Sequence, residues 1–273
     1  MLHLLCPEAP HGLGTRDLHP EQPGFILTID QFLSPGECAA LMAAADSLGL
    51  EPARPDDLRP KKNEAFLNRE TLAVVDVQLA ERLWSRLLPH LPCLEGREPV
   101  GLQGDRDATP SQLKFYRYRR GHRFGPHVDT SHKGVSPDEE TEFTFLVYLN
   151  SAGQISGEPA GTLDRREGDP QALSGGDTVF KRTVKAELAR VTPQQGMGLL
   201  HAHGRRCCMH EAEEVTHGEK YVLRADVTYR RVGSQVARDV GPDTDTCSSR
   251  SRTTKPFAQD KSGRRKGKMK FAE

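Results

Sequence analysis

The chain has 273 residues, enough for one large domain or for one domain with tails. Its 38 Lys and Arg residues balance its 38 Asp and Glu residues, so the whole molecule lacks the positive field typical of nucleic-acid-binding proteins. No stretch approaches the roughly 18 apolar residues of a membrane span. The six cysteines include no C-x-x-C pair, which argues against a zinc or redox motif and favours free thiols. We therefore expect a cytoplasmic or nuclear protein without a membrane segment.

The N-terminal part divides into an irregular arm and a supporting layer. Residues 1–23 are rich in Pro, Gly and His, and they lack both periodicity and the apolar core of a signal peptide. We expect a disordered arm there. A strand is predicted for residues 25–30, and the Ser-Pro-Gly-Glu run from Ser34 matches a helix start with a capping box. A second helix is predicted after Asp76, where apolar residues recur at helical spacing.

From residue 113 onward the pattern changes to strands with Gly-rich or polar connections. Two helices followed by such a series favour a mainly β fold, a jelly-roll with the helices packed on one face. The expected domain covers residues 24–232. Long polar loops are predicted at 130–140 and 151–174, where they would act as lids or insertions. The predicted strands cover residues 113–118, 141–149, 177–180, 186–191, 198–203 and 221–229.

The C-terminal segment, residues 233–273, is polar and contains the basic run KSGRRKGKMK at 261–270. We expect a disordered basic tail. Two interpretations stay open for it. The tail would mediate nuclear import or weak nucleic-acid contact, or it would be a solvated segment without a partner.

A His-x-Asp triplet is the first candidate for chemistry. In an extended segment, residues two apart point to the same side, so His127 and Asp129 can converge on one point. One imidazole and one carboxylate supply two ligands of a 2-His-1-carboxylate iron site. Such a triplet also occurs at exposed strand ends without a metal.

Two candidates exist for the third ligand. His201 and His203 share a strand face, so a count of imidazoles favours them. His210 instead precedes a strong strand in which Lys220 and Arg224 lie on one face. A cation about ten residues after a ligand can meet the far carboxylate of an anionic cosubstrate, which favours His210.

Four blocks of the sequence stand in a fixed order. They are YRRGHRFGPHVD from Tyr118 to Asp129, GGDTVF from Gly175 to Phe180, PQQGMGLLH from Pro193 to His201, and His210 followed by Lys220. In residues and order these blocks resemble the prolyl 4-hydroxylase-like family of Fe(II)- and 2-oxoglutarate-dependent oxygenases, and the resemblance places the metal-binding core at residues 113–230. The closing strand, VLRADVTY, is similar to an intracellular, plant-like branch of that family.

The resemblance implies a double-stranded β-helix that holds Fe(II) through His127, Asp129 and His210. It further implies that 2-oxoglutarate chelates the iron through its keto-acid end, with O2 as the second cosubstrate and ascorbate as the reductant. No catalytic residue beyond the metal site is expected. His201 and His203 are then assigned to strand packing or to the wall of the site.

The resemblance also assigns the far end of the cosubstrate. Its distal carboxylate would pair with Lys220, although Arg224 on the same strand face competes for this role or contacts the substrate. Tyr118 and Tyr148 match positions that hydrogen-bond the cosubstrate, and either tyrosine is alternatively a core aromatic residue.

The activity that the resemblance implies is hydroxylation of an unactivated C–H bond with release of succinate and CO2. A protein or peptide substrate is expected, with prolyl residues first. The alternatives are a nucleic-acid or small-molecule oxygenase of the same superfamily and a non-catalytic jelly-roll binding module. The complete donor set and Lys220 argue against the last.

Overall fold

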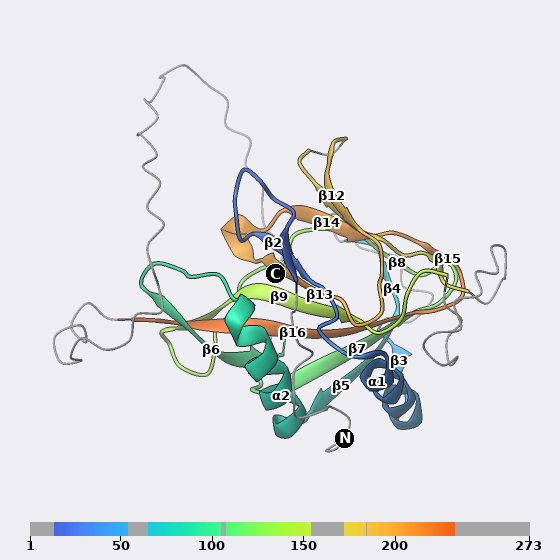
Figure 1. Cartoon of the computed structure of the whole chain (residues 1–273), viewed down its shortest axis with the longest axis horizontal. Coiled ribbons are helices and arrows are strands. Elements are labelled where there is room, and N and C mark those ends of the chain that lie inside the picture. The colour runs from blue at the N-terminus through green and yellow to red at the C-terminus, as the bar shows by residue number, and fades with distance from the viewer. Residues whose placement is uncertain (1–13, 54–64, 105–107, 154–171, 184, 233–273) are drawn as a thin grey trace. The chain divides into compact units, whose positions relative to one another are not determined.

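The computed structural model describes residues 14–53, 65–104, 108–153, 172–183 and 185–232 (Figure 1). The expected basic tail, the first thirteen residues of the expected arm and most of the expected loop 151–174 lie outside these residues. Within them, no helix is long and apolar enough to cross a membrane.

Two antiparallel sheets form the framework, and short strands β10 (Ser174–Gly175) and β15 (Val215–His217) pair separately. The larger sheet has the order β1 (Thr15–Asp17), β2 (Ile26–Ile29), β13 (Gly198–Ala202), β9 (Glu139–Tyr148), β16 (Lys220–Arg231), β7 (Gln112–Tyr118), β5 (Glu70–Val75) and β3 (Glu51–Pro52), with β6 (Arg97–Gln103) also paired to β16. The smaller sheet has the order β12 (Glu187–Val191), β11 (Thr178–Lys181), β14 (Met209–Ala212), β8 (Arg123–His127) and β4 (Leu67–Asn68).

Along the chain the strands alternate between the sheets. β7, β9, β13 and β16 belong to the larger sheet, while β8, β11 and β14 belong to the smaller one. This alternation is the winding of a jelly-roll, or double-stranded β-helix. The prediction of a mainly β jelly-roll with supporting helices is therefore confirmed.

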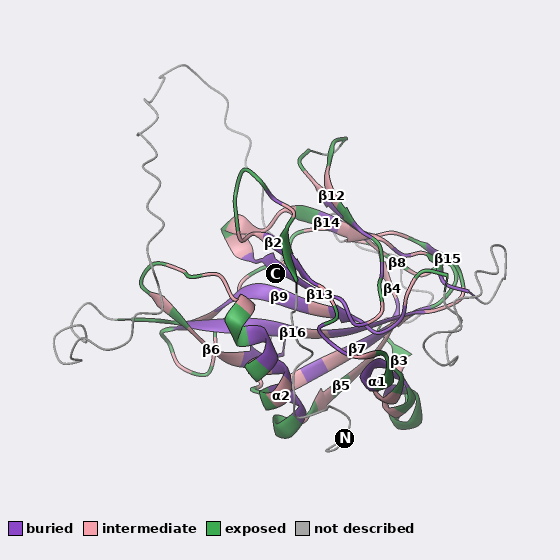
Figure 2. Ribbon diagram, viewed as in Figure 1, coloured by how far each residue is buried: buried purple, intermediate pink, exposed green. Residues whose placement is uncertain are grey.

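The central strands β9 and β16 divide the interior into two layers, and most of their residues are buried (Figure 2). Because side chains alternate across a strand, Phe143, Phe145 and Val147 enter the core on the helix side. Thr144 and Tyr148 point instead into a pocket between the sheets. One strand thus supports the core and the site at once.

The two predicted helices cover the outer face of the larger sheet (Figure 1). Helix α1 (Pro35–Leu48) begins with the predicted capping box of Ser34 and Glu37, and α2 (Val77–Leu87) is capped by Asp76. Buried Arg86 of α2 donates to Glu37 at 2.8 Å. That ion pair joins the first turn of α1 to the last turn of α2, so it holds the two helices together on the face of the sheet. Two 3-10 helices, η1 (Leu88–His90) and η2 (Gly204–Arg206), follow.

Residues 14–23 differ from the expected disordered arm. Strand β1 pairs with β2 and extends the edge of the larger sheet, and the Leu18 N–H donates to the Ile26 carbonyl at 2.9 Å. All three β1 residues are exposed, so this strand carries no apolar alternation. Backbone pairing at a sheet edge does not require apolar alternation, which explains why the sequence pattern did not indicate strand β1.

Candidate metal and cosubstrate site

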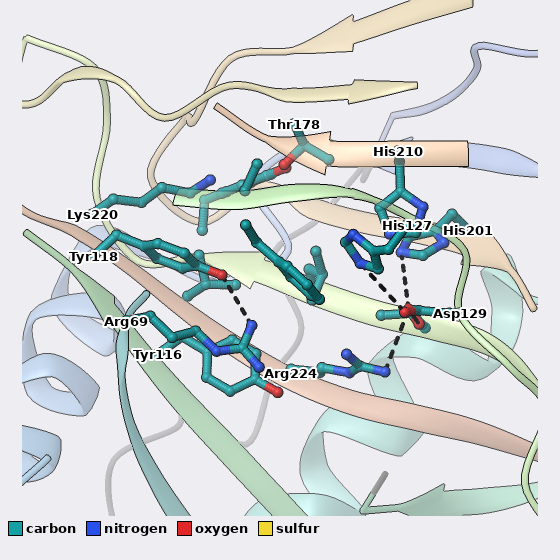
Figure 3. A pocket seen from close by; sticks show the side chains of 16 residues that line it. Arg69, Tyr116, Tyr118, His127, Asp129, Thr178, His201, His210, Lys220 and Arg224 are labelled. Atoms are coloured by element: carbon teal, nitrogen blue, oxygen red, sulfur yellow. Dashed lines mark hydrogen bonds and ion pairs between the residues drawn. The ribbon is translucent and has the colours of Figure 1, made fainter. Parts of the chain in front are cut away.

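A pocket between the two sheets contains the candidate site (Figure 3). One end of it carries imidazoles and Asp129, and the other end carries Lys220 (Figure 3). Its 16 lining residues include every residue that the sequence assigned to metal or cosubstrate: His127, Asp129, His210, Lys220, Tyr118, Tyr148 and Arg224.

Strand pairing brings the two candidate histidine ligands together. His127 ends β8 and lies directly opposite His210 of β14, with ring centroids 4.3 Å apart. Asp129 follows two residues after His127. Ligand atoms of the three side chains all lie within 4.8 Å of one another, a spacing that suits coordination of one cation.

Backbone carbonyls orient both imidazoles. His127 Nδ1 lies 2.8 Å from the Gly125 oxygen, and His210 Nδ1 lies 3.0 Å from the Cys208 oxygen. A carbonyl only accepts, so each Nδ1 carries the proton and each Nε2 carries the free lone pair. Burial and neighbouring His210 lower the pKa of His127 to about 3, which keeps this imidazole neutral. Metal-binding histidines have this arrangement.

Asp129 is held as a buried carboxylate. Thr144 Oγ1 donates to its Oδ2 at 2.6 Å, and Arg224 Nη2 lies 3.4 Å from the same oxygen. Burial opposes ionisation, but the Arg224 charge and the nearby imidazoles outweigh it, so the pKa of Asp129 lies well below its ordinary value. Two imidazoles and one carboxylate are the donor set of a 2-His-1-carboxylate Fe(II) centre, so these residues fit that ion.

Lys220 occupies the opposite end of the pocket. Its Nζ donates to the Gly176 carbonyl and lies 5.4 Å and 5.3 Å from the ring centroids of Tyr118 and Tyr148. Lys220 is 2% exposed, and burial lowers its pKa to about 7. In the described part of the chain, no carboxylate lies within ion-pair distance of it. An amine buried without a counter-charge suits an anionic ligand.

Thr178 and Arg69 complete the lining, although the sequence assigned neither a role. Tyr148 donates to Thr178 Oγ1 at 2.7 Å. Arg69 donates from Nη1 to the Tyr118 hydroxyl at 3.0 Å, and its guanidinium lies 3.4 Å from the Tyr116 ring centroid. Thr178 stands inside the GGDTVF block, which was its only signal. Arg69 lies between β4 and β5, at the end of a polar, Pro-containing stretch of the sequence at 51–69 that has no periodicity, so no pattern pointed to it.

Arg69 is also a buried cation without a counter-ion. It is 9% exposed, and among the described residues no carboxylate lies within ion-pair distance of it. Neither its Nε nor the Tyr116 hydroxyl has a hydrogen-bond partner. The pocket therefore presents a second positive group, in addition to Lys220, to whatever enters it.

The remaining candidates lie around Asp129. Arg224 Nε donates to Asp226 at 3.1 Å and its Nη2 approaches Asp129, so its guanidinium is engaged at the metal end. His201 lines the pocket with Nε2 3.9 Å from Asp129 Oδ2. His203 lies behind it and bonds Thr144. His201 thus lies at the wall of the site, while His203 contacts Thr144 and does not line the pocket.

A family model matches the part of the chain that forms most of the pocket. Residues 113–225 match the family model of the 2OG-Fe(II) oxygenase superfamily, a segment that contains all the residues assigned from sequence and excludes Arg69. A comparison with curated protein sequences finds no significant match.

Several solved structures are similar in shape. A viral collagen prolyl hydroxylase from Paramecium Bursaria Chlorella virus-1, in its 2OG complex, is 18% identical, with 75% of this chain and 96% of that chain covered and a TM-score of 0.47. A Pseudomonas putida prolyl-4-hydroxylase is 18% identical, with coverage of 77% and 94% and a TM-score of 0.48. A Trichoplax adhaerens prolyl hydroxylase in complex with a hypoxia inducible factor oxygen degradation domain peptide fragment is 14% identical, with coverage of 75% and 83% and a TM-score of 0.47. Such low identities and TM-scores transfer no substrate to this chain.

The family match and the pocket agree on one region. The matched segment runs from β7 into β16, and its strands supply both ends of the pocket. It is this segment, residues 113–225, that is similar to the 2OG-Fe(II) oxygenase superfamily.

Proposed function

We propose that the chain is an Fe(II)- and 2-oxoglutarate-dependent dioxygenase that hydroxylates an unactivated C–H bond in a protein or peptide, with prolyl residues as the first candidates. One observation carries this proposal. A single pocket contains a 2-His-1-carboxylate donor set at one end and a buried lysine without a carboxylate partner at the other. A keto acid with a distal carboxylate needs both features at once.

The chain's own residues supply orientation at the metal end. His127 and His210 would bind iron through Nε2, and Asp129 through its carboxylate. Thr144 and Arg224 hold the Asp129 carboxylate in place. When bound, Fe(II) supplies the oxidative decarboxylation of 2-oxoglutarate to succinate and CO2 that drives the hydroxylation, with ascorbate as the reductant. Three protein ligands leave room for the keto acid and O2.

At the other end, Lys220 is the favoured anchor for the distal carboxylate. Its ammonium group would gain a counter-charge that the described residues do not provide, with Tyr148 and Thr178 beside it. Arg224 is a weaker candidate because two carboxylates, Asp129 and Asp226, already occupy its guanidinium. This distribution of charge supports Lys220 in the role that the sequence left open between the two cations.

The peptide substrate rests on the resemblance to prolyl 4-hydroxylases. Prolyl hydroxylases also stand among the structures of similar shape, one of them in complex with a peptide. A nucleic-acid substrate depended on the basic tail at 233–273, which lies outside the described residues, and no observation of the pocket favours it. We therefore keep the peptide as the proposed target.

The test is turnover by the full chain with Fe(II), 2-oxoglutarate and ascorbate, measured as succinate released. Proline-containing peptides and single-stranded oligonucleotides are compared as substrates, and mass spectrometry detects the added oxygen atom. The Asp129→Ala variant should release no succinate, while His217→Ala, which alters an exposed histidine, serves as the matched control. Succinate release that survives Asp129→Ala would contradict the proposed centre. Oxygen added to the oligonucleotides alone would replace the peptide with a nucleic acid.

A further inference from the structure

A second group of potential metal ligands shares one residue with the candidate iron centre. Ligand atoms of His201, Cys207 and His210 all lie within 4.8 Å of one another. The His201 and His210 ring centroids are 4.5 Å apart, and Cys207 Sγ lies 3.9 Å from His210 Nδ1. These three side chains come from β13, from the residue after η2, and from β14. All three lie within residues 201–210, where the chain leaves β13, turns through η2 and enters β14.

His201 has a ring nitrogen that the fold leaves without a partner. The residue is 2% exposed, and its Nδ1 makes no hydrogen bond. Buried polar atoms in native proteins are nearly always paired, and an unpaired one costs on the order of 1–3 kcal/mol. A buried imidazole with an unpaired ring nitrogen is suited to bind a cation.

Cys207 adds a sulfur ligand to the pair of imidazoles. Its Sγ accepts the Asp129 backbone N–H at 3.2 Å, a bond that favours a thiolate, and lies 3.4 Å from the Cys208 carbonyl oxygen. A bound cation would release the proton of the Cys207 thiol, because thiols coordinate as thiolates.

One thiolate and two imidazoles form a donor set of different character from two imidazoles and one carboxylate. Sulfur ligands select Zn²⁺ and other thiophilic ions, and one Cys with two His suits a four-coordinate zinc with an open position. We propose that His201, Cys207 and His210 form a second metal site, selective for a thiophilic cation such as Zn²⁺, that competes with Fe(II) for His210.

Competition follows from the shared histidine. A neutral imidazole has one lone pair. A cation bound to His210 through Nδ1, the nitrogen 3.9 Å from Cys207 Sγ, would break the Nδ1 bond to the Cys208 carbonyl and leave the proton on Nε2, which removes the third ligand of the iron donor set. Zn²⁺ would then block the oxygenase by binding His210. It would bind at this site even if His127, Asp129 and His210 did not hold iron. This inference is therefore independent of the proposed activity.

The first experiment titrates the metal-free full chain with Cd²⁺ and follows the ultraviolet band of a cadmium thiolate. We expect the Cys207→Ser variant to lose this band, while the matched variant Cys208→Ser, altered at the next residue, retains it. His201→Asn should weaken cation binding at least about tenfold. A band that persists in Cys207→Ser, or that disappears in Cys208→Ser, would overturn the site.

The second experiment uses the unaltered protein, so it does not depend on a variant that folds. Iodoacetamide labels the thiols with and without Zn²⁺, and mass spectrometry reads each cysteine. Zn²⁺ should slow labelling of Cys207 more than that of Cys208, and equal slowing would contradict the proposal. Asp129→Asn separates the two centres. It should abolish Fe(II) binding but keep the cadmium band, and loss of the band there would show that the two donor sets are not distinct.

Discussion

His127 and His210 face each other across the paired strands β8 and β14, and each binds through Nδ1 the carbonyl oxygen of the residue two positions before it. The same backbone contact therefore fixes the tautomer of both rings. Their Nε2 atoms carry free lone pairs in the absence of any ligand. Because regular strands hold the two histidines, the donor set is preorganised on rigid elements.

The first prediction concerns the identity of the third ligand. His210→Ala should lose bound iron and succinate release, because it removes an oriented Nε2 donor. His201→Ala should keep its iron, because His201 is not one of the three grouped donors His127, Asp129 and His210. Iron content of the purified variants, measured by atomic spectroscopy, checks both outcomes. Iron lost from His201→Ala but retained in His210→Ala would assign the third ligand to His201.

The second prediction concerns the pH dependence of cosubstrate binding. Burial lowers the pKa of Lys220 to about 7, and a bound carboxylate would raise it again. Between these two values, binding of 2-oxoglutarate takes up a proton, so affinity falls as pH rises. From pH 7 to 9 the expected loss is roughly 50-fold at most, by linkage. Calorimetry of the anaerobic metal-loaded protein in two buffers of different ionisation enthalpy measures both affinity and proton uptake.

Lys220→Arg is the matched control, since a guanidinium stays charged across this range. Its affinity for 2-oxoglutarate should vary little with pH. Lys220→Ala should raise the KM for 2-oxoglutarate more than Arg224→Ala does. The reverse ranking would transfer the anchor to Arg224.

The third prediction links the same lysine to stability. The folded pKa of about 7 lies below the ordinary value of 10.5, so between these values the unfolded chain binds more protons than the folded chain. Stability without ligand should therefore rise with pH, by roughly 2 kcal/mol from pH 7 to 9. Urea denaturation measures this rise, which Lys220→Met should lack. Lys133→Met, altered at an exposed lysine, should keep it. An equal rise in both variants would mean that Lys220 is charged in the folded state.

The sequence predicted the residues whose signal is local. His127 ends β8 and Asp129 follows two residues later, while Lys220 and Arg224 share a face of β16, so short spacings along the chain relate them. The capping box at Ser34 is likewise a pattern of adjacent residues, and the structure confirms it. Such features survive in a single sequence because neighbours along the chain produce them.

Contacts between distant strands were less predictable. Arg69 reaches Tyr118 across 49 positions of the sequence, from a loop without periodicity. His201 and Cys207 stand only six residues apart, but neither a strand nor a helix period relates them, because the chain between them turns through η2. Lys220 and Arg224 also differ in a way that the sequence left open, because only the fold shows which cation already has carboxylate partners.

The fourth prediction compares two buried arginines of the same pocket. Arg224, with a side chain 11% exposed, contacts Asp129 and Asp226, and the Asp226 side chain is fully buried. Arg224→Met would leave that carboxylate without its partner, and breaking a buried pair costs about 3–5 kcal/mol. Arg69 has no such partner among the described residues. Arg69→Met should therefore change the free energy of unfolding by no more than about 1 kcal/mol, because lost contacts to Tyr118 and Tyr116 offset the removal of an unpaired charge.

Urea denaturation of both variants without ligand measures this contrast in stability. The affinity of each variant for 2-oxoglutarate is the second measurement. If Arg69 faces an anion that the pocket receives, Arg69→Met should weaken ligand binding while it leaves the fold intact. Arg224→Met should instead lower the free energy of unfolding more than it weakens ligand binding, because the Arg224 guanidinium stabilises Asp129 and Asp226. Equal destabilisation by the two variants would mean that Arg69 also has a counter-charge in solution. Its unpaired Nε would then not mark the ligand-facing side of the pocket.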